Sequence, residues 1–267
     1  MAERLPGDAV VEGAGAIESA GLGAPHIRAV LLDVDFTILR PNALFSAEGY
    51  RATAARFGLR LDVARWDEAE RRAYAAVKAR RAARGNVHDD GVYATIAEAI
   101  VTAMGDDDGP RVDECAAAIV AAWGRCENFT LYDDVRPCLA CLRTAGLAVC
   151  LVSNTSRDLA EVVGTFGLGE LVDGTVTSSE VGLCKPAPEI FAAALARVSA
   201  AACETVMVGD SYGDDVEGAL AAGLADAVLL DRDGRRARAL RAGAQSQRPA
   251  PAVIGSLAEL PALLGLA

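Results

Sequence analysis

The sequence is short of basic residues and of long apolar runs. Its 26 lysines and arginines face 37 acidic residues, which leaves a formal net charge of −11. This excess of acid argues against nucleic acid and anionic membrane surfaces as partners, because binding either one needs a basic face. No apolar run approaches the roughly 20 residues of a membrane span, and the opening stretch MAERLPGDAV lacks the apolar centre of a signal peptide. We therefore expect a cytoplasmic protein.

Histidine is scarce as well, and the cysteines show no pairing pattern. The chain of 267 residues has 2 histidines and 7 cysteines, an odd number, and a protein of this size needs no disulfide staples. Cys138 and Cys141 form a single CxxC pair within a predicted helix, with no histidine nearby. We interpret these thiols as small buried hydrophobic groups rather than as a zinc or redox site.

Two kinds of pattern divide the chain. Residues 1–24 are rich in glycine, alanine and glutamate without a period, and they predict a flexible N-terminal tail. A buried strand is predicted over residues 27–32, and residues 41–131 then show helical patterns and no convincing strand. After Asp133, short apolar runs alternate with helical stretches, which is typical of a parallel sheet covered on both faces. The later strands are predicted at 147–153, 172–178, 205–210, 226–230 and 252–254.

The position of the helical block decides the expected domain organisation. The first strand precedes the block and the remaining strands follow it, so the block is an insertion rather than a leading domain. We predict an α/β fold, with a Rossmann-like parallel sheet formed by residues 25–40 and 132–267. Residues 41–131 are predicted to form an inserted, all-helical cap domain.

Polar residues follow four of the predicted strands. In a parallel α/β sheet, ligands bind at the carboxyl ends of the strands, so side chains from separate segments meet there. Agreement among four segments is stronger evidence for a site than any one of them. The residues are Asp33 and Asp35 after the first strand, Ser153 and Asn154 after the second, Lys185 after the third, and Asp210, Asp214 and Asp215 after the fourth.

The chemistry of this set follows from its charge. Asp33, Asp35 and Asp210 would crowd negative charges into one cleft, which is costly unless a cation neutralises them. Carboxylate oxygens without imidazole or thiolate suit Mg²⁺, which completes its shell with water and phosphate oxygens. Lys185, the Ser153 hydroxyl and backbone amides add donors for an anion. A carboxylate beside a bound phosphate can attack it and form an aspartyl phosphate.

These motifs resemble the phosphatase branch of the haloacid dehalogenase (HAD) superfamily. The DxDxT pattern of the family is matched by Asp33, Asp35 and Thr37, and its serine or threonine by Ser153. The family's lysine, often followed by proline, is matched by Lys185-Pro186, and its GDxxxD or GDxxxxD motif by Asp210 with Asp214 or Asp215. The resemblance covers residues 27–40 and 132–267, and the helical block fits the cap that many members insert after the first strand.

The resemblance implies a Mg²⁺-dependent phosphomonoester hydrolase that acts on a small phosphorylated metabolite through an aspartyl phosphate. Asp33 would be the nucleophile and a metal ligand. Asp35 would be the general acid and base, with its backbone carbonyl at the metal. Thr37 would orient the loop, and with Ser153, Asn154 and Lys185 it would form the phosphate site. Asp210 would ligate Mg²⁺. Either Asp214 or Asp215 would support the metal through its ligands, and the sequence does not decide which of the two.

The cap and one core residue bear on substrate choice. Phe36 stands where phosphatases of the family usually have glycine. Its backbone amide remains, so we expect the difference to affect substrate shape more than chemistry. On the cap, His88, Asp89 and Tyr93 either face substrate or simply begin a helix. The basic run over residues 71–85 is typical of a solvated helix face, although Arg71, Arg72 or Lys78 could reach an anionic substrate.

Other functions compete with the phosphatase reading. A dehalogenase of the same fold is weaker, because cleaving a carbon–halogen bond needs neither a metal nor a proton donor at the leaving group. A phosphomutase shares the motifs. A non-catalytic phosphate-binding or signalling protein is a different class. In a phosphorylated receiver the lysine comes last, whereas Lys185 precedes Asp210 here.

Overall fold

The computed structural model describes residues 26–105, 109–234 and 251–266. The predicted tail over residues 1–24 lies outside the described residues. Within the described part of the chain, no helix is both long and apolar enough to cross a bilayer.

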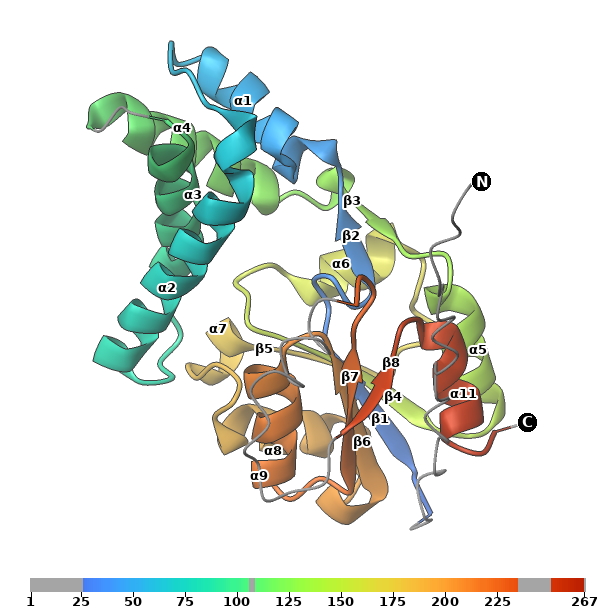
Figure 1. The fold of residues 1–267 in the computed structure, drawn as a ribbon. Coiled ribbons are helices and arrows are strands. Elements are labelled where there is room, and N and C mark those ends of the chain that lie inside the picture. The colour runs from blue at the N-terminus through green and yellow to red at the C-terminus, as the bar shows by residue number, and fades with distance from the viewer. Residues whose placement is uncertain (1–25, 106–108, 235–250, 267) are drawn as a thin grey trace, which may run out of the picture.

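A six-stranded sheet forms the centre of the molecule, in the order β5-β4-β1-β6-β7-β8 (Figure 1). Every neighbouring pair in it is parallel. This confirms the predicted α/β fold with its parallel sheet. The strands are β1 (Ala29–Leu32), β4 (Ala148–Ser153), β5 (Gly174–Thr177), β6 (Thr205–Gly209), β7 (Asp226–Leu230) and β8 (Ala252–Ile254).

The strand order places β1 at the point where the chain changes direction across the sheet. From β1 the chain continues to β4 on one side, and later returns to β6 on the other side. The carboxyl end of β1 therefore lies beside the carboxyl ends of both neighbours. This is where parallel α/β sheets bind their ligands, because the loops on the two sides separate there.

Helices cover both faces of the sheet. Alternate residues of a strand point to opposite faces, and in β1 Val30 joins one apolar core while Leu31 joins the other. The first core contains side chains of α5 (Val135–Thr144) and α6 (Leu159–Thr165), and the second contains side chains of α8 (Pro188–Val198) and α9 (Gly218–Ala221). Among the described residues, the core also contains the short helices α7 (Ser178–Val181) and α11 (Leu260–Leu263).

Four helices form a second layer beside the sheet, at the upper left of Figure 1. Ser46 begins the first of them, since its side chain accepts a hydrogen bond from the backbone of Gly49. In this layer α2 packs against α3, and α3 packs against α4. The helices are α1 (Ala47–Ala55), α2 (Trp66–Arg84), α3 (Gly91–Met104) and α4 (Pro110–Trp123).

A short antiparallel ribbon links the helical layer to the sheet. It pairs β2 (Leu39–Pro41) with β3 (Phe129–Leu131). The expectation that residues 41–131 contain no strand is wrong for β3. Its three residues show no local period, and they become a strand only because β2 lies beside them.

Candidate active site

A buried lysine connects two carboxylates at the carboxyl edge of the sheet. Lys185 Nζ lies 2.6 Å from Asp33 Oδ1 and 2.6 Å from Asp215 Oδ1, and it also donates to the carbonyl of Val152 at 2.9 Å. These contacts use all three donors of the ammonium group. Burial disfavours the charge on Lys185, but the two carboxylates outweigh it and raise the pKa of Lys185 above its ordinary value. The lysine is therefore charged across the physiological pH range.

Three acids gather around this lysine. One carboxylate oxygen each from Asp33, Asp210 and Asp215 lies within 4.8 Å of the others. Burial raises the pKa of Asp215, and the charge of Asp33 raises it further, while Lys185 acts in the opposite direction. A single lysine offsets only part of this negative charge. The donor set consists of hard oxygens, and it fits Mg²⁺.

The structure separates Asp214 from Asp215, which the sequence left open. Both lie in a π-helical turn, Tyr212–Glu217, that follows β6. Asp215 turns inward and accepts a hydrogen bond from the backbone of Ser211 at 2.9 Å. Asp214 turns toward the helical layer, where its Oδ2 lies 2.7 Å from Arg81 Nη1. Of the two, Asp215 belongs to the group of carboxylates that could hold a metal ion.

Gly209 explains how Asp215 comes so close to the sheet. It is the last residue of β6. A Cβ atom at this position would collide with the Asp215 carboxylate. Glycine is therefore required at this position for the close approach of the carboxylate. This is the physical reason for the glycine of the GD motif.

Asp35 lies near the cluster but faces a different partner. Its Oδ1 accepts a hydrogen bond from Arg157 Nη1 at 2.9 Å, and its side chain is 15% exposed. Burial raises the pKa of Asp35, and Arg157 opposes that rise. The side chain of Asp35 is not one of the three carboxylates of the cluster. Val34, between the two acids, is fully buried.

The turn after Asp35 places an aromatic ring at the edge of the site. Phe36 has φ of 63°, a left-handed conformation that is unusual for a bulky residue. Its backbone N–H donates to the carbonyl of Leu39 at 2.8 Å. The side chain is 43% exposed, and its ring centroid lies 6.1 Å from that of Trp123 at the end of α4. The ring therefore stands between the sheet and the helical layer.

The predicted phosphate-binding residues occupy different surroundings. Ser153 ends β4 and is buried. Asn154 ties down the Lys185 segment, because its side chain accepts from the Lys185 backbone N–H at 2.7 Å and donates to the Lys185 carbonyl at 3.1 Å. Thr37 is fully buried, and among the described residues its hydroxyl has no hydrogen-bond partner. Lys185 contacts Asp33 and Asp215, and the Asn154 side chain also donates to Asp214 Oδ2 at 3.4 Å.

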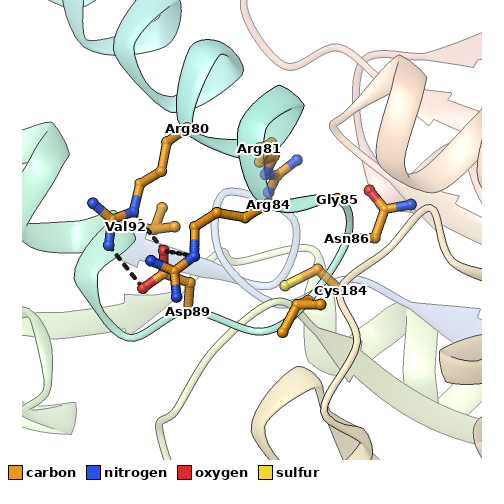
Figure 2. A pocket seen from close by; sticks show the side chains of 9 residues that line it. Arg80, Arg81, Arg84, Gly85, Asn86, Asp89, Val92 and Cys184 are labelled. Carbon is orange, nitrogen blue, oxygen red and sulfur yellow. Dashed lines mark hydrogen bonds and ion pairs between the residues drawn. The ribbon is translucent and has the colours of Figure 1, made fainter.

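Several residues of the helical layer touch the core around the site. His88 Nδ1 lies 2.8 Å from Ser178 Oγ, and the hydroxyl of Tyr93 donates to the carbonyl of Asn154 at 3.0 Å. Figure 2 shows the small pocket where the end of α2 meets the segment before Lys185. There Asp89 binds Arg80 and Arg84, rather than a core residue.

Sequence reasoning missed two arginines. Arg157 is 7% exposed and pairs with Asp35, and Arg81 reaches Asp214 from the helical layer. Arg72, which was considered for substrate contact, instead pairs with Glu68 on the surface of α2. No local pattern marks Arg157 or Arg81, because their partners are 122 and 133 residues away along the chain.

Comparisons with known proteins identify the family of this chain. The model of the haloacid dehalogenase-like hydrolase family matches residues 27–223. A glyceraldehyde 3-phosphate phosphatase from Methanopyrus kandleri is 31% identical over 204 residues, covering 74% of this chain and 82% of that relative. The ribulose-1,5-bisphosphate 5-phosphatase of Halopiger xanaduensis is 37% identical over 125 residues, covering 46% of this chain and 52% of that relative, about half of its length.

A solved structure extends the comparison to nearly the whole fold. A HAD phosphatase from Thermococcus onnurineus superposes with a TM-score of 0.58 at 26% identity, covering 90% of this chain and 99% of that one. The family match spans more than half of the chain. The protein therefore belongs to the haloacid dehalogenase-like hydrolases, as its motifs predicted, and it is an enzyme of the hydrolase class.

Proposed function

We propose that the protein is a Mg²⁺-dependent phosphatase that hydrolyses the phosphomonoester of a small phosphorylated metabolite. The observation that carries this proposal is the buried set of Asp33, Lys185 and Asp215, with Asp210 beside it. It combines a carboxylate in direct contact with a lysine with further acids that can hold a metal. Two relatives named as phosphatases of small phosphorylated compounds support the substrate class.

In the proposed reaction, Asp33 attacks phosphorus and an aspartyl phosphate forms as the leaving-group oxygen departs. Asp35 gives a proton to that oxygen, and afterwards takes one from the water that attacks the phosphorus. Inorganic phosphate leaves and the Asp33 carboxylate is regenerated. Lys185 holds the Asp33 carboxylate in place, while Ser153 donates its hydroxyl to the phosphoryl group.

The acids fit the metal that the family resemblance implies. Asp33, Asp210 and Asp215 offer oxygen donors only, together with the Asp35 backbone carbonyl that the resemblance adds. Mg²⁺ bound there supplies positive charge that offsets the charges of the carboxylates and of the phosphoryl oxygens.

Residues 41–131 act in this proposal as a cap that selects the leaving group. Tyr93 and Trp123 come from this part of the chain, and they lie against Asn154 and Phe36 at the edge of the site. A cap in this position excludes water from the reacting groups and surrounds the part of the substrate that differs between metabolites.

Phosphate release from a panel of phosphorylated metabolites tests the proposal. With Mg²⁺ we expect turnover of at least one small phosphomonoester, and Ca²⁺ should replace Mg²⁺ poorly because its larger, looser shell misplaces the nucleophile. Asp33→Asn should abolish turnover. Asp67→Asn makes the same chemical change on the exposed face of α2 and should leave activity intact. Full turnover in excess chelator would contradict the metal-dependent mechanism.

A further inference from the structure

We propose that Arg157 is a positioning residue. It orients the Asp35 carboxylate for proton transfer, and it makes that orientation depend on the position of the cap. This inference rests on the proposed function, in which Asp35 moves the proton. Arg157 lies between β4 and α6, in a segment that no motif marks. Its side chain binds one oxygen of Asp35, so that the other oxygen can face the leaving group.

Three close contacts hold the guanidinium group of Arg157 in place, and the Trp123 ring lies farther away, with its centroid 6.0 Å from the guanidinium carbon. Nη1 donates to Asp35 Oδ1 at 2.9 Å, and Nη2 donates to the carbonyl of Trp123 at 3.0 Å. The guanidinium carbon lies 4.2 Å from the ring centroid of Phe129, a cation–π distance. The side chain of Arg157 is only 3% exposed. A rotation that kept the Asp35 bond would break at least one of the other two contacts.

The second and third contacts come from the cap side of the molecule. Trp123 is the last residue of α4, and Phe129 is the first residue of β3, where the chain returns to the sheet. Asp35, by contrast, lies just after β1 in the core. One guanidinium group therefore connects the proton-transfer carboxylate with the return segment of the cap. A displacement of that segment would move Arg157, and Asp35 with it.

Geometry argues for positioning rather than for direct contact with phosphate. Lys185 is the cation in contact with Asp33, whereas the planar fork of Arg157 is shared between Asp35 and the Trp123 carbonyl. A planar guanidinium group that donates to two acceptors and stacks on a ring has a fixed orientation, which the ammonium group of a lysine would not have. Misplacing a catalytic group by about 1 Å can cost roughly 100-fold in rate.

Arg157→Met tests the inference through its dependence on the leaving group. An alkyl phosphate needs its leaving oxygen protonated, whereas p-nitrophenyl phosphate needs little help. We expect kcat/KM to fall about 10- to 100-fold for the alkyl phosphate, and much less for the nitrophenyl ester in the first step. Competitive inhibition by inorganic phosphate should stay within about twofold of wild type. Arg143→Met breaks another arginine–aspartate pair, with Asp173, and should match wild type.

A double-mutant cycle with Asp35→Asn makes the test specific. If Arg157 acts through Asp35, adding Arg157→Met to Asp35→Asn should cost no more than about twofold further, because the positioned group is already gone. Additive losses, or equal losses for both leaving groups, would overturn the inference in favour of a structural role. Weakened inhibition by phosphate would overturn it in favour of direct phosphate binding.

Two further variants cover the case in which Arg157→Met does not fold. Arg157→Lys keeps the charge without the fork, and Phe129→Leu removes the ring while leaving Arg157 and Asp35 unchanged. Both should show the same dependence on leaving group, to a smaller extent. If the wild-type protein hydrolyses no phosphomonoester, the proposed function fails and this inference with it. If wild type is active, Asp35→Asn is impaired and the Arg157 variants match wild type, only this inference fails.

Discussion

Asp33 and Asp35 are two residues apart, yet the fold gives them different surroundings. Asp33 contacts a buried lysine and belongs to the acidic cluster, whereas Asp35 contacts an arginine that stacks on an aromatic ring. A carboxylate held in place by Lys185 suits attack on phosphorus. Burial that raises the pKa of Asp35 helps it to hold a proton, as an acid–base group must. Their environments support different roles for two chemically identical side chains.

Asparagine substitutions separate these roles. Asp33→Asn removes the nucleophile, so we expect no phosphoenzyme and only background turnover. Asp35→Asn leaves the nucleophile but removes the base for the second step, which is worth roughly 10²–10⁴-fold in rate. With an aryl phosphate, it should release about one alcohol per active site in a burst, followed by slow turnover. Rapid-quench measurements would detect the burst, and phosphate trapped on any residue but Asp33 would contradict the assignment.

Burial also separates the cysteines. It raises the pKa of Cys138 to about 12, with a smaller contribution from Asp134, and that of Cys150 to about 12. At pH 8 almost none of either thiol is the reactive thiolate. Cys203 is exposed, so iodoacetamide should modify it first in the native protein, and mass spectrometry of digested peptides would show the order. Equal labelling of Cys138 and Cys203 without unfolding would disprove the packing described for α5.

At the scale of single elements, two helix ends show how the backbone conformation favours some residue types over others. The helix α8 ends at Ser199, which has φ of 50° and ψ of 41°. The Cβ atom of serine makes this left-handed region sterically unfavourable, whereas glycine adopts it without that cost. Gly223, just after α9, has φ of +85° with open space around it. Both positions have a positive φ, but one is occupied by serine and the other by glycine.

Exchanging these choices should move stability in opposite directions. Ser199→Gly relieves left-handed strain and should raise the free energy of unfolding by about 0.5–1 kcal/mol. Gly223→Ala introduces that strain and should lower it by about 1 kcal/mol. Urea titrations followed by circular dichroism would measure both. Both positions are exposed, so a loss of stability in Ser199→Gly would show that the serine has a role beyond its backbone conformation.

At the scale of the whole molecule, the helical layer is joined to the core by a set of contacts beyond the chain connections. The backbone of His88 donates to the carbonyl of Gly182 at 2.9 Å, and that of Cys184 donates to the carbonyl of Asn86 at 2.7 Å. Arg81 pairs with Asp214 beside them. These contacts end one residue before Lys185, so the helical layer lies directly beside the segment that carries this lysine.

Arg81→Gln should weaken the contact between the helical layer and the core without unfolding the protein. The ion pair is partly exposed, at 32% for Arg81 and 21% for Asp214, and its loss should favour local opening. We expect the backbone amides of His88 and Cys184 to exchange hydrogen a few-fold faster, as measured by mass spectrometry on peptides. Arg71→Gln, on an exposed part of α2, is the matched control. Unchanged hydrogen-exchange rates in Arg81→Gln would mean that the two backbone hydrogen bonds hold the helical layer against the core without the ion pair.

The family and the parallel sheet followed from local patterns. Each core strand is a short apolar run, and each of the motif residues Asp33, Ser153 and Asp210 stands at or just after the end of one. Because a parallel sheet aligns the carboxyl ends of its strands, the order of the motifs was enough to predict that they meet. The roles of these residues and the limits of the cap stay predictions.

The partners of Asp35 and Asp214, and the strand β3, depended on tertiary contacts. Arg157 and Arg81 are ordinary arginines in the sequence, and only folding brings them to acids more than a hundred residues away. Asp214 and Asp215 are neighbours in the chain, and the direction of a single helical turn sends one to the helical layer and the other to the acidic cluster. Periodicity reports which face of an element is buried, whereas the choice of a charged partner is made by long-range geometry, which leaves no period in the sequence.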